Sequence, residues 1–105
     1  MKENMNPQTQ ELLHAKLNLE TAMFSWKELQ RFFATGVVIW VDDALDMVDV
    51  ALKISEDDST AVADWLNSGL LARVSDEQAL RWFEDDAMLW SVVVKPWILV
   101  QERSA

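Results

Sequence analysis

The sequence predicts a single α+β domain in which a long N-terminal helix and several shorter helices pack on a small, mostly antiparallel sheet. Residues 7–35 hold apolar side chains at helical spacing, with no Gly and with Pro only at the first position. Residues 36–101 alternate β-branched runs with amphipathic segments. The 105 residues suffice for one core. We therefore divide the chain into a disordered start at 1–6, the long helix, the α+β core and a tail at 102–105.

The long helix is predicted from its two ends and its apolar repeat. Asn6 is a good N-cap, Pro7 suits a first helical turn, and Gly36 supplies a stop. A helix of about 28 residues is about 42 Å long, which exceeds the dimensions of a domain of this size. Either the helix overhangs the domain or a second chain covers part of it. We expect a homodimer interface at the heptad positions Leu12, Leu19, Trp26 and Phe33.

The α+β core is predicted from short apolar runs and helix-capping residues. Strands are expected at 37–41, 70–74, 88–94 and 97–101, the last two buried on both faces because nearly every position is apolar. A helix is expected to start at Asp42 or Asp43, and another after the polar residues 56–59. A third is expected at Ser75, which forms a capping box with Gln78. Lys95-Pro96 is expected to form a turn or a bulge.

An internal similarity links two parts of this core. Residues 33–43 align with residues 66–76 at an offset of 33, and each stretch reads as helix, Gly, strand, polar cap and helix. Two similar units around one sheet would indicate a duplication. A chance match between two common local patterns explains the similarity equally well.

Composition argues against several classes of function. The chain has 9 Lys+Arg against 18 Asp+Glu, a formal net charge of −9, and no Cys. Such a charge disfavours nucleic-acid binding, and the missing Cys excludes thiolate zinc sites and disulfides. No apolar stretch is long enough for a membrane span, so a cytoplasmic protein is expected. His14 stands alone as a poor candidate for a catalytic base, so we expect neither an enzyme nor a cofactor.

Acidic residues are the most numerous ionisable residues of the chain. Asp42, Asp46 and Asp49 lie at i, i+4 and i+7, so a helix would place them on one face, where they could bind a divalent cation. Helix capping and solvation explain the same residues without a metal. Residues 42–86 hold 13 acidic and 3 basic residues, which predicts one strongly negative region suited to a basic protein partner. Solubility alone is the simpler explanation of this charge.

The six tryptophans fall mostly on predicted core positions. Trp26, Trp65 and Trp82 lie on helical apolar stripes, and Trp40 and Trp90 lie in predicted strands. Trp97, directly after Pro96, is the candidate for an exposed aromatic side chain at a site.

Four segments resemble a family of small bacterial proteins known only as a domain of unknown function. They are Glu11–Ala22, Trp26–Phe33, Ala72–Gln78 (ARVSDEQ) and Val92–Gln101 (VVVKPWILVQ). The resemblance covers nearly the whole chain, and its most specific part is the Val-Lys-Pro-Trp segment. It implies a stand-alone cytoplasmic protein and brings no activity, cofactor or site residue.

Taken together, these observations favour a non-enzymatic interaction or regulatory protein that acts as a homodimer with an acidic surface. The alternative is a small metal- or ligand-binding protein that uses the row Asp42, Asp46 and Asp49.

Overall fold

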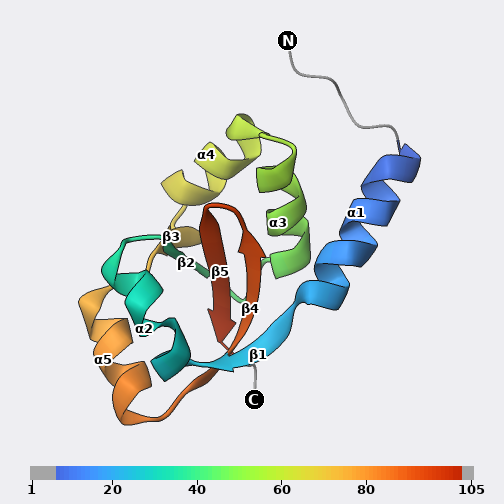
Figure 1. The fold of residues 1–105 in the computed structure, drawn as a ribbon. Helices are drawn as coiled ribbons and strands as arrows, with labels where there is room; N and C mark the ends of the chain where they lie inside the picture. Colours follow the sequence, from blue (N-terminus) through green and yellow to red (C-terminus); the bar gives the residue numbers. More distant parts are fainter. Residues whose placement is uncertain (1–6, 103–105) are drawn as a thin grey trace.

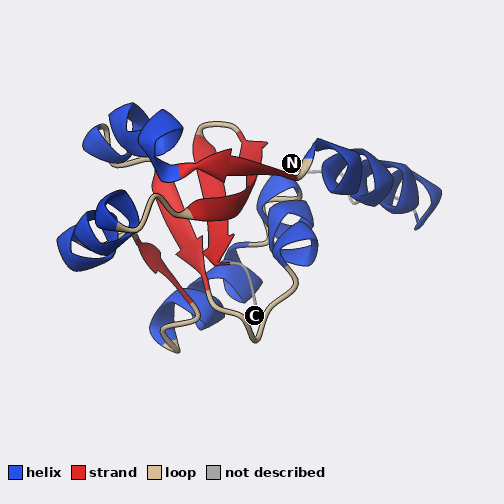
Figure 2. Ribbon diagram, turned by 90° about the horizontal axis from the view of Figure 1, so that it is seen from below, coloured by secondary structure: helices blue, strands red, loops and turns tan. Residues whose placement is uncertain are grey.

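The computed structural model describes residues 7–102 of the chain. These residues form a five-stranded sheet with helices on both faces (Figure 1, Figure 2). The elements are α1 (Pro7–Glu20), β1 (Ala22–Ser25), α2 (Trp26–Ala34), β2 (Val38–Val41), α3 (Met47–Ser55), α4 (Ser59–Asn67), β3 (Leu71–Arg73), α5 (Asp76–Glu84), β4 (Met88–Val94) and β5 (Trp97–Glu102). The predicted α+β class is confirmed. Asn6, the predicted disorder at 1–6 and most of the tail at 102–105 lie outside the described residues.

The strand order in the sheet is β1-β4-β5-β2-β3. Three of the four neighbouring pairs are antiparallel, and β2 with β5 is parallel. The predicted mostly antiparallel sheet is therefore confirmed, and β2 to β5 form at the predicted positions. The last two strands of the chain lie in the middle of the sheet, between β1 and β2 (Figure 1).

Two hydrophobic clusters fill the two faces of the sheet. Alternate residues of a strand point to opposite faces, so Leu99 joins one cluster and its neighbours Ile98 and Val100 join the other. On the first face, α1, α3 and α4 pack over Val41, Val92 and Leu99. On the second, α2 and α5 pack over Val38, Leu89 and Val100. Burial on both faces is confirmed for β5, whose Ile98, Leu99 and Val100 are buried. The same prediction is wrong for β4, because Met88, Trp90 and Val93 are exposed.

The prediction of a single helix over residues 7–35 is wrong. This segment forms two helices, α1 and α2, with the strand β1 between them. The hydroxyl of Thr21 donates to the carbonyl oxygen of Leu17 at 2.8 Å, where α1 ends. Ser25 then caps α2, and its side chain accepts from the backbone N–H of Glu28 at 3.4 Å. Between these two residues, Met23 and Phe24 pair with β4. Backbone pairing at the sheet edge therefore overrides the helical apolar pattern.

Capping residues set the other helix starts. Ser75 and Gln78 form the predicted capping box, with hydrogen bonds of 3.0 and 3.1 Å. The prediction that Asp42 or Asp43 caps α3 is wrong. Asp46 is the cap and accepts from the backbone N–H of Val48 at 2.9 Å. Asp42 instead accepts from the N–H of Ala44 at 2.8 Å and closes a turn before the helix.

The predicted turn at Lys95-Pro96 joins β4 and β5. Val94 pairs with Trp97 directly across the two-residue connection, and the Lys95-Pro96 peptide bond is cis. The hairpin therefore closes without a backbone N–H at Pro96.

The two similar sequence units form similar local structures. Gly36 follows α2 and Gly69 follows α4, with φ angles of 78° and 79°. Each glycine leads into a strand, and the two strands, β2 and β3, are antiparallel neighbours. The repeat is thus present in the geometry, whichever of its two origins applies.

Gly69→Ala is expected to lower the free energy of unfolding by about 1 kcal/mol, because a left-handed backbone brings a Cβ too close to the following carbonyl. A Cβ at Gly69 would meet no other atom within 4 Å, so the loss comes from the backbone conformation alone. Urea unfolding measures it. Gly69→Asn, the control, is expected to lose less, because Asn tolerates this conformation better. Equal stability of the unaltered protein and Gly69→Ala would contradict the prediction.

Candidate functional site

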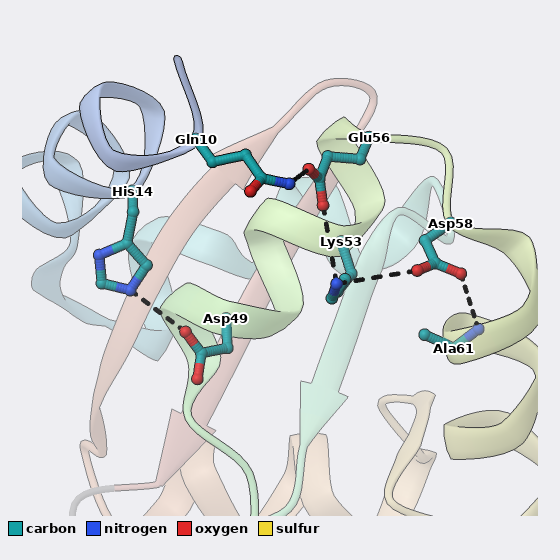
Figure 3. A network of polar contacts seen from close by, with 7 residues as sticks. All are labelled: Gln10, His14, Asp49, Lys53, Glu56, Asp58 and Ala61. Atoms are coloured by element: carbon teal, nitrogen blue, oxygen red, sulfur yellow. Dashed lines mark hydrogen bonds and ion pairs between the residues drawn. The ribbon is translucent and has the colours of Figure 1, made fainter. Parts of the chain in front are cut away.

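Two polar contacts join α1 to the neighbouring helix α3 and its C-terminal cap (Figure 3). The side-chain amide of Gln10 donates to the carboxylate of Glu56, and His14 Nε2 lies 3.2 Å from Asp49 Oδ1. Both contacts join α1 to α3 or to the residue that caps its C-terminus. The single histidine therefore has a partner on the neighbouring helix.

A second set of contacts extends from α3 to the start of α4 (Figure 3). Lys53 Nζ lies 3.9 Å from Glu56 Oε1 and 3.8 Å from Asp58 Oδ2. Asp58 also caps α4, since its other carboxylate oxygen accepts from the N–H of Ala61 at 3.1 Å. The carboxylate of Asp58 is therefore committed to the local structure.

The predicted interface residues fall into two groups. Leu12 and Leu19 lie on α1 and are 68% and 85% exposed. Trp26 and Phe33 lie in α2 and pack in the core on the second face of the sheet, with ring centroids 5.5 Å apart. The four residues therefore do not form one stripe. The expectation that Trp26 and Phe33 line an interface fails because the chain leaves the helical path at Thr21.

The exposed leucines define an apolar face on α1. Leu12, Ala15 and Leu19 are spaced i, i+3 and i+7, and all three are exposed. The opposite side of α1 carries Leu13 and Leu17, which pack against the core beside α3. We call Leu12, Ala15 and Leu19 the outer face of α1.

The adjoining strand β1 is an edge of the sheet. It pairs with β4 on one side, and within residues 7–102 no strand pairs with its other side. Its sequence is Ala-Met-Phe-Ser, and Phe24 is exposed. Natural edge strands commonly carry a charge or a proline that blocks pairing with another chain, and β1 has neither. Within residues 7–102, no other strand therefore occupies this edge.

The structure does not bring the aspartate row together on one helix face. Asp42 lies in the turn before α3, Asp46 is the cap, and Asp49 lies within the helix beside His14. The helix that would align all three begins only at Met47. In the described part of the chain, no group of three or more His, Cys, Asp or Glu residues could hold a metal ion. The metal hypothesis therefore has no geometric support there.

The acidic segment 42–86 lies on both sides of the sheet. Eight of its 13 acidic residues fall at 42–64, along α3 and α4, and five at 76–86, along α5 and the turn after it. The helices α3 and α4 cover one face and α5 covers the other. The negative charge therefore faces two directions, and a basic partner for either side stays a prediction.

Trp97 is half-buried and lines a cavity of about 620 Å³ beneath α4. Among the described tryptophans, Trp90 is the exposed one, at 40%. Arg73, which was not predicted as a site residue, lines the same cavity. The available signal was its place as the single charged residue in the apolar run Leu70–Val74.

No helix within residues 7–102 combines the length and the apolar character that crossing a bilayer requires. The helices and strands together make this a small α+β domain built on a five-stranded mixed sheet.

This chain belongs to the family described as Protein of unknown function (DUF2288), whose profile matches residues 12–102. The family membership predicted from the sequence segments is thus confirmed. A solved structure that this chain resembles is the NMR solution structure of PA1075 from Pseudomonas aeruginosa, at 48% sequence identity and a TM-score of 0.78. The match covers 98% of this chain and 94% of that chain. No curated protein matched this chain.

Proposed function

We propose that the protein is a non-enzymatic interaction protein of the cytoplasm that acts as a homodimer. Its interface would combine the outer face of α1 with the open edge of β1. The observation that carries the proposal is the exposure of Leu12 and Leu19, at 68% and 85%, on a helix whose other side is already packed. Exposed apolar patches on a folded domain favour contact with another protein surface.

The positions of α1 and β1 support a two-fold contact. The two elements are consecutive in the chain, and the C-terminal end of α1 leads into β1 (Figure 1, Figure 2). Antiparallel pairing of two β1 edges would extend the sheet across both subunits. It would also bring the two α1 helices to the same interface. Burial of Leu12 and Leu19 against the partner would then remove their side chains from water.

The double variant Leu12→Glu/Leu19→Glu is expected to be monomeric, because it places two charges in an apolar contact. The unaltered protein is expected to have twice the 12.1 kDa mass of one chain. Light scattering behind a sizing column, at high micromolar concentration, measures both. The melting temperature of the folded monomer is expected to change little, since both side chains point to solvent within one subunit.

Asn18→Glu is the matched control, because Asn18 is exposed on α1 but lies beside the outer face. This variant is expected to remain dimeric. A monomeric mass for the unaltered protein would overturn the proposal. A dimeric mass for the double variant would show that α1 is not the interface.

A further inference from the structure

The cavity beneath α4 is bounded by apolar side chains from the sheet and from two helices. Its floor is formed by Ile39, Leu71 and Trp97, from three neighbouring strands in the half of the sheet that contains β5, β2 and β3. Its roof is formed by Ile54 at the end of α3 and by Val62 and Leu66 of α4. A volume of about 620 Å³ lies within the range of small-molecule sites.

The helix above the cavity is poorly buried. None of the nine residues of α4 is buried, although the helix carries Val62, Trp65 and Leu66. Leu66 is 51% exposed. An amphipathic helix normally buries its apolar side against the sheet below it. Here the cavity lies between α4 and the sheet, so an apolar occupant would complete the packing of the helix.

The rim of the cavity carries one cation, Arg73. It lies directly opposite Ile39 across β2 and β3, at the edge of the sheet. Within residues 7–102 its guanidinium takes part in none of the observed ion pairs or hydrogen bonds. A guanidinium presents a planar set of donors that matches a carboxylate.

The two acidic side chains at the rim do not compensate this cation. The carboxylate of Asp58 contacts Lys53 and caps α4 (Figure 3). Asp57 is exposed and forms no ion pair among the described residues. Arg73 is therefore the group at the rim that can take an anionic partner.

We propose that this cavity binds a small carboxylic acid with an apolar body, whose carboxylate pairs with Arg73 and whose body lies between Trp97 and α4. The apolar lining selects the body, and the single guanidinium selects the charged end. This site is separate from the outer face of α1, so it holds whether or not the protein is a dimer.

Titration of the ¹⁵N-labelled protein with decanoate tests the proposal by NMR, with decan-1-ol as the uncharged probe of the same length. Decanoate is expected to shift the signals of α4, β3 and the Trp97 indole N–H. Arg73→Gln is expected to weaken decanoate binding about tenfold, since a charge-assisted pair is lost, and to leave decanol binding nearly unchanged. Lys95→Gln, which removes an exposed cation outside this cavity, is expected to leave decanoate binding unchanged.

A second variant tests the cavity itself. Val62→Trp is expected to fill the space and abolish the binding of both probes, while the spectrum of the rest of the chain shows that the protein remains folded. Three results would overturn the proposal: no shifts with decanoate, an unchanged decanoate affinity in Arg73→Gln, or shifts confined to the groove lined by Phe24, Phe32 and Val93.

Discussion

Trp26→Ala is expected to lower the free energy of unfolding by about 3 to 5 kcal/mol, the loss typical of a large aromatic side chain removed from a core. Trp26 is 1% exposed and packs edge-to-face against Trp82, with ring centroids 5.1 Å apart. It also contacts Phe33 from the same helix. A loss of this size is a large part of the stability of a small domain. Urea unfolding followed by circular dichroism measures it.

Trp26→Phe is the control that separates packing from hydrogen bonding. The indole N–H of Trp26 is buried and has no hydrogen-bond partner among the described residues. Phenylalanine therefore removes no hydrogen bond, and we expect it to lose less than half as much stability as alanine. Because the side chain is internal, both variants are expected to keep the oligomeric state of the protein as long as they fold. A stable, folded Trp26→Ala variant with an altered mass would return Trp26 to an interface role.

Leu17→Ala is expected to release α1 from α3. Leu17 is 4% exposed and is the one buried residue of α1. Removing a buried leucine typically lowers stability by about 2 to 5 kcal/mol. The remaining polar contacts, Gln10 with Glu56 and His14 with Asp49, are partly or fully exposed and contribute little. Hydrogen exchange measures the effect: the amides of α1 should lose protection while those of β4 and β5 keep it.

Leu12→Ala is the matched control on the same helix. Leu12 is of the same residue type but points outward, so within one subunit we expect a change of no more than about 0.5 kcal/mol. Equal protection of α1 in the Leu17→Ala variant and in the unaltered protein would contradict the prediction. It would show that the polar contacts alone hold α1 in place.

The elements that could be predicted from the sequence are those with strong local signals. Ser75 and Gln78 identify the start of α5, and Gly36 and Gly69 identify the ends of α2 and α4. The β-branched runs identify β2 to β5. These features depend on residues close together in the chain, so they can be read without knowing the fold.

The boundary between α1 and α2 could not be predicted in this way. Met23 and Phe24 fit the apolar pattern of a helix, and only pairing with β4, more than 60 residues later, makes them a strand. The local signal was Ser25 with Glu28 three residues later, which is a helix start within a segment already assigned to a helix. The start of α3 was ambiguous because several aspartates compete for the role of cap.

The candidate sites depend even more on the three-dimensional arrangement. Leu12 and Leu19 could be assigned to one helix from the sequence because both lie in α1, and their role in an interface stays a prediction. Arg73 and Trp97 are 24 positions apart in the sequence, and the order of β5, β2 and β3 alone brings them to one cavity. No local pattern predicts that order, because it arises from pairing between distant strands.

The central position of the last two strands has a consequence for the nascent chain. Two strand pairs, β1 with β4 and β2 with β5, cannot form until residues 88–102 have been synthesised. The complete sheet therefore cannot assemble while the ribosome still holds that segment. Until then, the antiparallel pair of β2 with β3 is the sole strand pairing open to the elements in residues 7–84. Loss of the C-terminal hairpin should therefore leave β1 separated from the β2–β3 pair, because β4 and β5 lie between them in the sheet. Distant pairing of this kind also slows folding, because a long loop must close before the contacts form.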